Sequence, residues 1–469
     1  MQYILNYSLQ IIFYVFGFFG LLVSLKCFLD SSKYTSIFFI SFIVSFIIGY
    51  FFKVLFNKNK ILKEKNLVIT IFSSWLLLTL VSAIPFLSFI DVLAISDIFF
   101  ISTSFITTTG FQHKFLDSLN VSEAFNIWCS IIQLIGGVFS IVSYILFFLV
   151  FFNKHDKHIV FNKNIILKFF SYYFFLFLGF FIFLNLFLED IYFSFMISSA
   201  IISTGGQIGS FGPVLGYYYS NNLYLIIYLF LSITTILILP LFLIIQNYKV
   251  LESSYIKLLN RSLILLLVVL LILCLLFEIS ALNFIERFFI YFSFLTTSGI
   301  LPNKTSDILV IQQLSPLFFI FLILIIIGSL SGSSGGGLKI DKISILFIKI
   351  RSELRKLTLS HKLYGAELIK KGYNQKELNS LFALLALGGI FVAVTLLILT
   401  SSGHSVFESF VLTMASLTNT GEGFLHVNNM SLNKSFFSYL ILNFLMIFGR
   451  FEVIGYLLIF QKFTIKNSL

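Results

Sequence analysis

Apolar residues fill long runs of this chain, and short polar stretches separate the runs. Residues 37–52, 68–90, 263–277 and 314–327 contain no charged side chain. A helix that spans a membrane needs about 20 apolar residues, with a range of roughly 17 to 25. Flanking residues extend the shorter runs to that length, so the pattern predicts ten spanning helices and four shorter apolar half-helices.

The order of these elements repeats along the chain. Two opening spans, residues 3–29 and 35–56, precede four repeats of span, half-helix, polar tip and span. The expected half-helices are residues 93–107, 192–202, 284–296 and 406–417. Backbone that stops midway through a bilayer must be buried in protein or line water. The order therefore predicts an all-α polytopic membrane protein, with four parallel span–pore-helix–span repeats around a central pore and two extra N-terminal transmembrane helices.

The repeats divide the chain into five predicted units. Residues 1–60 hold the two N-terminal helices, 61–160 the first pore repeat and 161–250 the second. Residues 251–350 hold the third repeat, with an interrupted stretch at 328–337. Residues 351–469 hold a connector and the fourth repeat. The expected spans are 68–90 and 124–152 in the first repeat and 165–188 and 223–246 in the second. They are 262–282 and 309–350 in the third repeat and 379–399 and 435–463 in the fourth.

Each half-helix is followed by a short polar phrase that ends in glycine. A helix C-terminus carries about half an elementary negative charge, which favours a cation. Backbone carbonyls and hydroxyls can replace the water around that cation. One such phrase alone is explained by the packing of small residues in a membrane, but four after four half-helices predict a cation selectivity filter. The phrases are Thr108, Thr109 and Gly110; Ser203, Thr204 and Gly205; Thr297, Ser298 and Gly299; and Asn419, Thr420 and Gly421.

The placement of charge predicts how the chain lies in the membrane. The chain is 58% hydrophobic and 11% charged, with a net charge of +11 and a mean hydropathy of +1.02. Its basic residues gather in the connectors between repeats and in the tail, and the opposite loops hold few. By the positive-inside rule the basic connectors and both termini are expected to be cytoplasmic. Because the basic residues border membrane spans, nucleic acid is excluded as the reason for the charge.

Other chemistry is sparse. Cys27, Cys129 and Cys274 lie in or beside apolar runs, and an odd, scattered set predicts packing rather than a disulfide frame or a metal site. A membrane enzyme needs clustered His, Asp, Glu or Cys, which the predicted spans lack. The pairs His404 with Glu408 and Glu278 with Glu286 are interpreted as helix-end or pore-mouth residues. We therefore expect no enzyme and no covalent cofactor.

Two features of the later helices are unusual for apolar spans. Residues 328–337 interrupt an apolar helix with glycines and serines, and no Gly-Lys-Ser/Thr ending supports a phosphate loop. Arg450 lies in an apolar helix, where an unpaired charge costs roughly 2.5–3.5 kcal/mol on insertion scales. It could pair with another helix, form an electrostatic barrier, or hold a gating loop, and we favour the last.

These motifs resemble the Trk/Ktr/HKT superfamily, specifically the transmembrane subunit of bacterial Trk/Ktr-type potassium uptake. The resemblance covers about residues 60–465. It rests on the four glycine-ended tips, on the stretch from Gly328 through Gly337 to Lys339, and on the run from Gly449 to Glu452. It implies potassium as the transported ion, because a serine at the first filter glycine tends to accompany sodium transport in the family. Ser298 and Glu422 depart from the family pattern.

The resemblance also implies partners and a location. It implies a homodimer in a bacterial cytoplasmic membrane, with a pore in each protomer and residues 328–337 as an intramembrane gating loop. The predicted gate residues are Gly328, Gly332, Ser333, Ser334, Gly335, Gly336, Gly337 and Arg450. The chain carries no recognisable nucleotide site, so regulation is expected from a cytosolic nucleotide-binding subunit. The glycine spacing grows from 95 to 122 residues across the connector at 339–376, which is the expected docking place.

Two alternatives remain within transport. One is a sodium-conducting or sodium- or proton-coupled cation transporter of the same superfamily. The other is a secondary transporter with alternating access, which would often show inverted repeats and intramembrane acidic residues; here the repeats are predicted to run parallel.

Overall fold

The computed structural model describes residues 2–55, 64–111, 123–152, 163–208, 215, 221–245, 253–277, 282–302, 316–356, 375–427 and 436–450. These residues form helices joined by turns and loops, with an isolated bridge where the Leu215 N–H donates to the Leu301 carbonyl at 2.8 Å. The predicted all-α fold class is confirmed.

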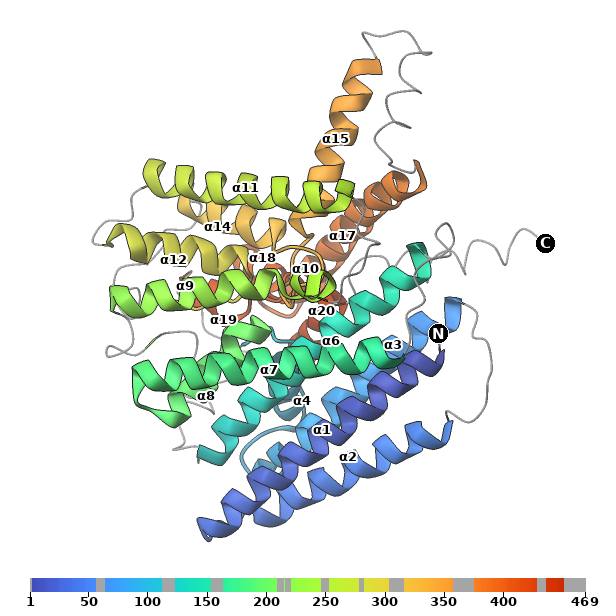
Figure 1. Cartoon of the computed structure of the whole chain (residues 1–469), viewed down its shortest axis with the longest axis vertical. Helices are drawn as coiled ribbons and strands as arrows, with labels where there is room; N and C mark the ends of the chain where they lie inside the picture. Colours follow the sequence, from blue (N-terminus) through green and yellow to red (C-terminus); the bar gives the residue numbers. More distant parts are fainter. Residues whose placement is uncertain are drawn as a thin grey trace, which may run out of the picture.

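The chain begins with a helical hairpin at one edge of the molecule (Figure 1). Helices α1 (Gln2–Leu29) and α2 (Thr35–Leu55) pack along each other. Gly20 allows the close approach, since a Cβ there would lie 3.0 Å from the Ser41 hydroxyl. Lys26 joins α1 to the repeats: its ammonium donates to the Glu123 carboxylate at 2.5 Å and to the Tyr192 hydroxyl at 3.0 Å.

Each repeat places a short apolar helix between longer ones. The first contains α3 (Glu64–Ala83), the 3-10 helix η1 (Ile84–Phe89), α4 (Ile95–Ile106) and α6 (Glu123–Phe152). The second contains α7 (Lys163–Leu188), α8 (Ile191–Ser203), α9 (Asn222–Ile236) and α10 (Ile238–Ile245). The third contains α11 (Ser253–Leu276), α12 (Phe284–Leu295), α14 (Pro316–Ile327) and α15 (Ile340–Lys356). The fourth contains α17 (Gln375–Ser401), α18 (Val406–Leu417), α19 (Glu422–Val427) and α20 (Phe436–Arg450).

One expected span ends in a 3-10 helix and another is broken, and proline explains both departures. Proline lacks the N–H that an α-helix needs in its interior. Pro85 lies in the 3-10 helix that ends the first span of repeat one. Pro240 lies in the first turn of α10, directly after the break at Leu237 that separates α9 from α10. The expected interruption at residues 328–337 separates α14 from α15.

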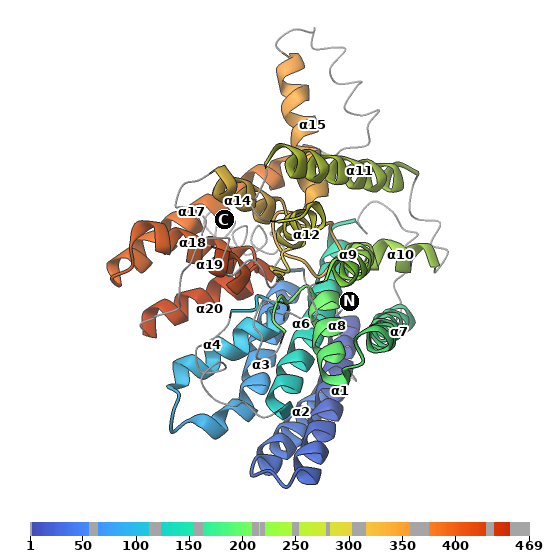
Figure 2. The same ribbon diagram turned by 90° about the vertical axis from the view of Figure 1, so that its left-hand side faces the viewer.

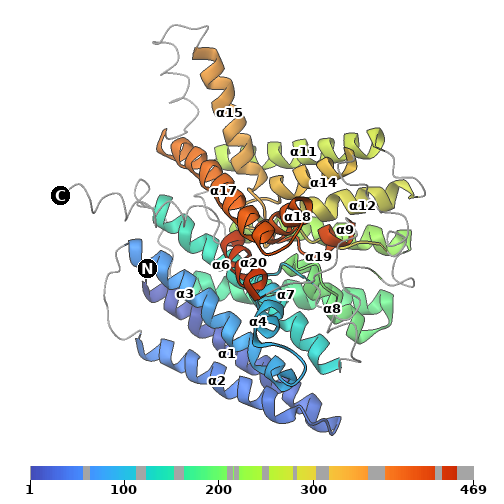
Figure 3. The same ribbon diagram turned by 180° about the vertical axis from the view of Figure 1, so that it is seen from behind.

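The half-helices α4, α8, α12 and α18 lie around the middle of the molecule (Figure 2). The most apolar part of α6, within residues 123–146, is completely buried in the protein. Helix α6 packs against α4 and α8. Helix α20 packs against α4 and α18 (Figure 3), which brings the last repeat back to the first. Helix α15 leaves this body and extends away from it.

Length and hydropathy mark several of these helices as membrane spans. Among the described residues, five helical stretches are long and apolar enough to cross a bilayer: 5–29, 35–54, 69–89, 123–146 and 165–188. The remaining apolar helices are shorter in their described parts. The exposed faces of both the long and the short apolar helices carry large apolar side chains such as Phe175, Phe230 and Leu397, as expected of a surface in contact with lipid.

Candidate ion-conduction site

The four half-helices end in the same backbone motif. The residue after each helix cap adopts the left-handed conformation, with φ between 49° and 57°, at Thr108, Thr204, Thr297 and Asn419. Its N–H donates three residues back, and the next N–H donates five residues back, as in a Schellman motif. In the first tip these bonds run from Thr108 to Phe105 and from Thr109 to Ser104, at 3.0 and 2.9 Å.

This motif corrects the expected alignment of the second tip by one residue. Thr204, not Ser203, holds the left-handed position, and Gly206, not Gly205, has the positive φ of 68° that Gly110 has in the first tip. The hydrogen bond from Gly205 N–H to Ala200 O matches that from Thr109 to Ser104. The equivalent tips are therefore residues 108–110, 204–206, 297–299 and 419–421.

The four tips form a closed ring. In each tip the last glycine lies against the carbonyl of the middle residue of the next tip, so close that a Cβ could not be added without displacing backbone. For Gly299 that Cβ would lie 2.8 Å from the Thr420 oxygen, and for the other three it would lie closer still. The pairs are Gly110 with Gly205, Gly206 with Ser298, Gly299 with Thr420, and Gly421 with Thr109.

The order of these pairs follows the repeats: one to two, two to three, three to four, and four back to one. The Asn419 amide reinforces the closure by donating to the Thr109 hydroxyl at 2.9 Å. Four equivalent carbonyls are thereby placed around one axis, at the negative ends of four helices.

The ring is held under backbone strain. A non-glycine residue in the left-handed region costs of order 1–3 kcal/mol and persists where the surroundings over-determine it. Four such residues occur at equivalent positions, and all are almost fully buried. The surrounding structure therefore holds the tips in this conformation despite its local energetic cost. Strain of this kind gathers at ligand-binding sites.

Paired hydroxyls brace three of the tips from behind. The helix-cap hydroxyl contacts the hydroxyl of the middle tip residue, at 2.8 to 3.1 Å. The second tip has Gly205 at the middle position and lacks this pair. The three pairs are Thr107 with Thr109, Thr296 with Ser298, and Thr418 with Thr420.

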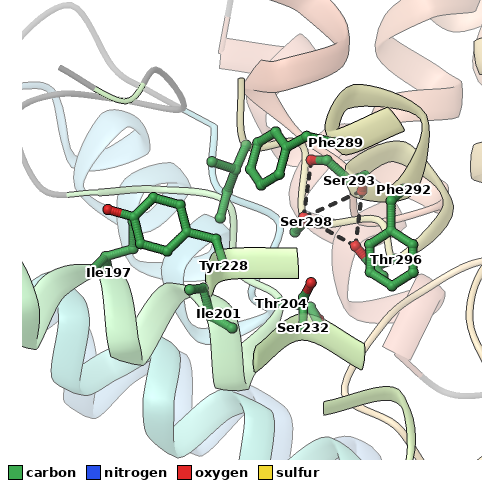
Figure 4. Close-up of a pocket in the computed structure, with 11 residues that line it drawn as sticks. Ile197, Ile201, Thr204, Tyr228, Ser232, Phe289, Phe292, Ser293, Thr296 and Ser298 are labelled. Carbon is green, nitrogen blue, oxygen red and sulfur yellow. Dashed lines mark hydrogen bonds between the residues drawn. The ribbon is translucent and has the colours of Figure 1, made fainter. Parts of the chain in front are cut away.

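A small cavity lies beside the third tip, between α8, α9 and α12 (Figure 4). Its wall is mainly apolar, with Ile197, Ile201 and Phe289 among the lining residues. Ser293 and Ser298 also line it, and their hydroxyls contact each other at 3.1 Å. Ser298, which departs from the family pattern, thus belongs to a hydroxyl cluster behind the ring.

Residues 328–337 lie against the side of the ring where the half-helices end. The Ser334 hydroxyl donates to the Ile202 carbonyl at 3.0 Å, and the Gly336 N–H donates to the Thr297 hydroxyl at 2.6 Å. A Cβ on Gly336 would collide with the Thr418 carbonyl. The segment therefore contacts the ends of the second, third and fourth half-helices directly.

Arg450 connects this segment to the first tip. Its side chain is 4% exposed. One guanidinium nitrogen donates to the Ser334 carbonyl, Nε donates to the Thr107 carbonyl at 2.5 Å, and another nitrogen donates to the Thr108 carbonyl at 3.2 Å and to its hydroxyl. These contacts make Arg450 a bridge between residues 328–337 and the ring. Glu452 lies outside the described residues.

Two further charged residues form hydrogen bonds with the backbone of residues 328–337. The buried Lys339 ammonium donates to the Gly335 carbonyl and to the Ser333 carbonyl at 3.4 Å. The Asp341 carboxylate accepts the Ser331 N–H at 2.9 Å. Lys339 was predicted only as part of the family motif and of the connector at 339–376, and Asp341 was not predicted to have a role, although both lie within four residues of Gly337.

The remaining acidic candidates lie at helix ends. Glu286 caps the start of α12 by accepting the Asn283 N–H at 2.9 Å, and His404 lies 3.2 Å from Glu408 in the first turn of α18. The Glu422 N–H donates to the Gly110 carbonyl at 3.2 Å, which places the start of α19 beside the first tip. Glu278 lies outside the described residues.

Among the described residues, no group of three or more His, Cys, Asp or Glu side chains is placed to hold a metal ion. Cys27, Cys129 and Cys274 are all buried and free.

The fold and site define a multi-pass helical membrane protein with a four-part ring of carbonyls at its centre. Known proteins share both its fold and part of its sequence. Residues 307–467 match the TrkH family model, described as a cation transport protein. The Trk system potassium uptake proteins TrkH of Escherichia coli K12 and Salmonella typhimurium are each 30% identical over 179 residues.

Those 179 residues are 37% of this chain and 35% of each relative, so the match spans about a third of the relatives' length. The crystal structure of the potassium transporter TrkH from Vibrio parahaemolyticus has a TM-score of 0.76 and 20% identity, and the match covers 97% of this chain and 98% of that one. The fold is thus shared throughout. The sequence similarity covers part of that shared fold, with residues 307–467 of this chain matching the TrkH family model.

Proposed function

We propose that the chain conducts potassium ions into the cell through the ring of four tips. The closed ring carries the proposal, because each glycine lies against the middle carbonyl of the next tip. A membrane potential supplies about 2.3 kcal/mol per charge per 100 mV, which corresponds to about 50-fold accumulation. Uptake through such a ring needs no second ion.

Potassium is favoured over sodium because glycine occupies the last position of all four tips. Each glycine combines a positive φ of 62° to 75° with no room for a side chain. In such a ring the oxygens belong to the backbone, so their spacing does not depend on side-chain rotamers. A fixed spacing of oxygens can match the size of the potassium ion. The relatives are named as potassium uptake proteins, which supports the same ion.

Residues 328–337 are proposed to close the path on the side of the ring where the half-helices end. Their contacts reach the ends of three half-helices, and Arg450 adds the first tip. Each glycine makes a helix less stable by roughly 1 kcal/mol relative to alanine. A glycine-rich segment therefore adopts non-helical conformations easily and can rearrange. Arg450 holds the closed arrangement through carbonyl oxygens.

The proposed orientation places the basic connectors and both termini in the cytoplasm, following the positive-inside rule. Helix α15 carries Lys342, Lys349, Arg351, Arg355 and Lys356 and extends away from the helical body. We assign it as part of the docking surface for a cytosolic nucleotide-binding regulatory subunit. The homodimer remains a prediction.

Shortening residues 353–375 tests the docking assignment. The shortened chain should insert into the membrane and should lose a cytosolic partner that co-purifies with the full chain. A partner that stays bound to the shortened chain would place the docking surface elsewhere.

Growth of a bacterium that lacks its own potassium uptake pores tests the function. Expression of the chain, in a host that keeps its regulatory subunits, should restore growth at low potassium. Gly206→Ala should abolish the rescue, because its Cβ would enter the Ser298 carbonyl and its φ is 68°. Gly179→Ala is the matched control, since nothing lies within 4 Å of its Cβ.

Immunoblots of the membrane fraction should show equal amounts of the three proteins. If Gly206→Ala rescues growth as well as the unmodified chain does, ions do not pass through this ring.

A further inference from the structure

The second tip differs from the other three in how it is supported. At the other tips a hydroxyl on the middle residue contacts the helix-cap hydroxyl. At the second tip the middle residue is Gly205, and the cap hydroxyl of Ser203 donates back along its own helix to Ser199 O at 2.6 Å. The wall behind this tip must therefore be completed by another part of the chain.

Gln133 of α6 occupies that place. A Cβ on Gly205 would lie 2.8 Å from the Gln133 amide carbon, 3.0 Å from its oxygen and 3.0 Å from the Ser203 hydroxyl. The amide group thus fills the volume that the threonine or serine side chain fills in the other tips. It approaches the tip from a neighbouring repeat rather than from the same turn of chain.

The Gln133 amide is completely buried, yet neither its oxygen nor its nitrogen has a hydrogen-bond partner among the described residues. Burying an amide without a partner costs about 1–3 kcal/mol by protein mutational data, so such groups require an explanation. Gln133 lies in the otherwise apolar middle of α6, where an apolar residue would avoid this cost.

A second unpartnered group lies near Ser203. The Tyr173 hydroxyl, on α7, is buried and also has no partner among the described residues. A Cβ on Gly137 would lie 2.7 Å from this hydroxyl and 2.9 Å from both Cα and Cβ of Ser203. Glycine at position 137 thus leaves room for polar atoms of α6, α7 and α8 to approach one another behind the second tip.

We propose that Gln133, Tyr173 and Ser203 bind an ordered water molecule that braces the second tip. A buried water typically makes about three hydrogen bonds. Gln133 and Tyr173 have unsatisfied polar atoms, and the Ser203 hydroxyl, which donates to Ser199 O, can still accept a hydrogen bond. An amide, a phenol and a hydroxyl are all neutral, and together they supply donors and acceptors, which suits water. Gln133 is therefore a positioning residue for the filter, and the inference rests on the proposed conduction through the ring.

The proposal says that a water bound by Gln133 replaces, at the second tip, the hydroxyl pair that supports the other three tips. A double-mutant cycle that removes the amide and adds a hydroxyl tests this. Gln133→Ala removes the water-binding amide, and Gly205→Ser brings a side chain into collision with that amide. Each single change should lower the K⁺ over Na⁺ preference of reconstituted protein by roughly three- to tenfold, the range of one lost buried hydrogen bond. The double variant places a hydroxyl beside Ser203, as in the other tips, and should recover the preference to within about twofold.

Tyr173→Phe separates the water from mere space filling. The missing hydroxyl should lower the preference in the unmodified chain and should have no effect in the double variant, where a direct hydroxyl pair replaces the water. Unfolding temperatures of all the variants, measured without transported ions, should show the same non-additivity. This second readout does not depend on conduction.

The outcomes separate the two proposals. If the chain is not selective for potassium but the unfolding temperatures of the variants are non-additive as expected, the proposed function is contradicted and the proposed water site is supported. A selective chain in which Gln133→Ala changes neither preference nor unfolding temperature would overturn the brace, as would a double variant worse than both single variants.

Discussion

Replacing Arg450 with alanine is expected to raise cation flux through reconstituted protein at least about tenfold in the absence of a regulatory subunit. Arg450 is the bridge between residues 328–337 and the first tip, with bonds to the Ser334, Thr107 and Thr108 carbonyls. Hydrogen bonds from charged groups are worth about 1.5–3 kcal/mol each. Losing the bond to Ser334 alone would shift the balance between closed and open segment by about tenfold or more. Flux of a potassium analogue into vesicles measures the change.

Arg450→Lys distinguishes the two ways in which this arginine could restrict ions. Lysine keeps the positive charge but lacks the planar fork that reaches several carbonyls at once. If Arg450 holds the segment in place, the lysine variant should also conduct faster than the unmodified chain. If its charge repels ions, the lysine variant should stay closed.

Arg351→Ala is the matched control, because Arg351 is exposed on α15. It should leave flux at the level of the unmodified chain. Folded Arg450→Ala protein that conducts no faster than this control would contradict the proposed gate.

Gly110→Ser is expected to lower the preference for potassium over sodium by at least about tenfold, or about 1.4 kcal/mol. The new Cβ would enter the Gly205 carbonyl, and the φ of 75° at this position is strained for any residue with a side chain. The ring must widen or tilt its oxygens, so the spacing that replaces the potassium hydration shell is lost. The reversal potential between potassium and sodium solutions measures the preference.

Gly179→Ser provides the control for Gly110→Ser, since a Cβ on Gly179 meets nothing within 4 Å. Its reversal potential should equal that of the unmodified chain. An unchanged preference in Gly110→Ser would remove the first tip from the filter.

The half-helices could be predicted closely because their signals are local. Residues 406–417 were expected to form a half-helix and form α18, and the other three agree within a few residues. The 3-10 end of the first span and the break between α9 and α10 were missed, although Pro85 and Pro240 are visible in the sequence. Apolar run length predicts that a helix exists, whereas proline decides where its hydrogen bonding stops.

The alignment of the second tip could not be settled from sequence. Ser203-Thr204-Gly205 and Thr204-Gly205-Gly206 both match hydroxyl residues followed by glycine. Only the backbone angles and the bond from Gly205 N–H to Ala200 O identify Gly206 as the equivalent of Gly110.

Contacts between distant repeats were beyond the reach of sequence patterns. Arg450 bonds to Thr108, 342 residues away, and no local periodicity encodes such a pair. Gln133 did leave a signal, as an amide within an apolar run three and four residues before Gly136 and Gly137. Its partner tip, however, becomes evident only when α6 is packed against α8.

The reversal potential of the unmodified protein, with potassium on one side of the membrane and sodium on the other, tests the central claim most directly. For a monovalent cation a tenfold preference gives about 59 mV. A filter made of four glycine-ended tips predicts a potential well beyond that value, with the sign set by potassium. A potential near zero, or one with the sign set by sodium, would contradict the assignment of the ring as a potassium filter.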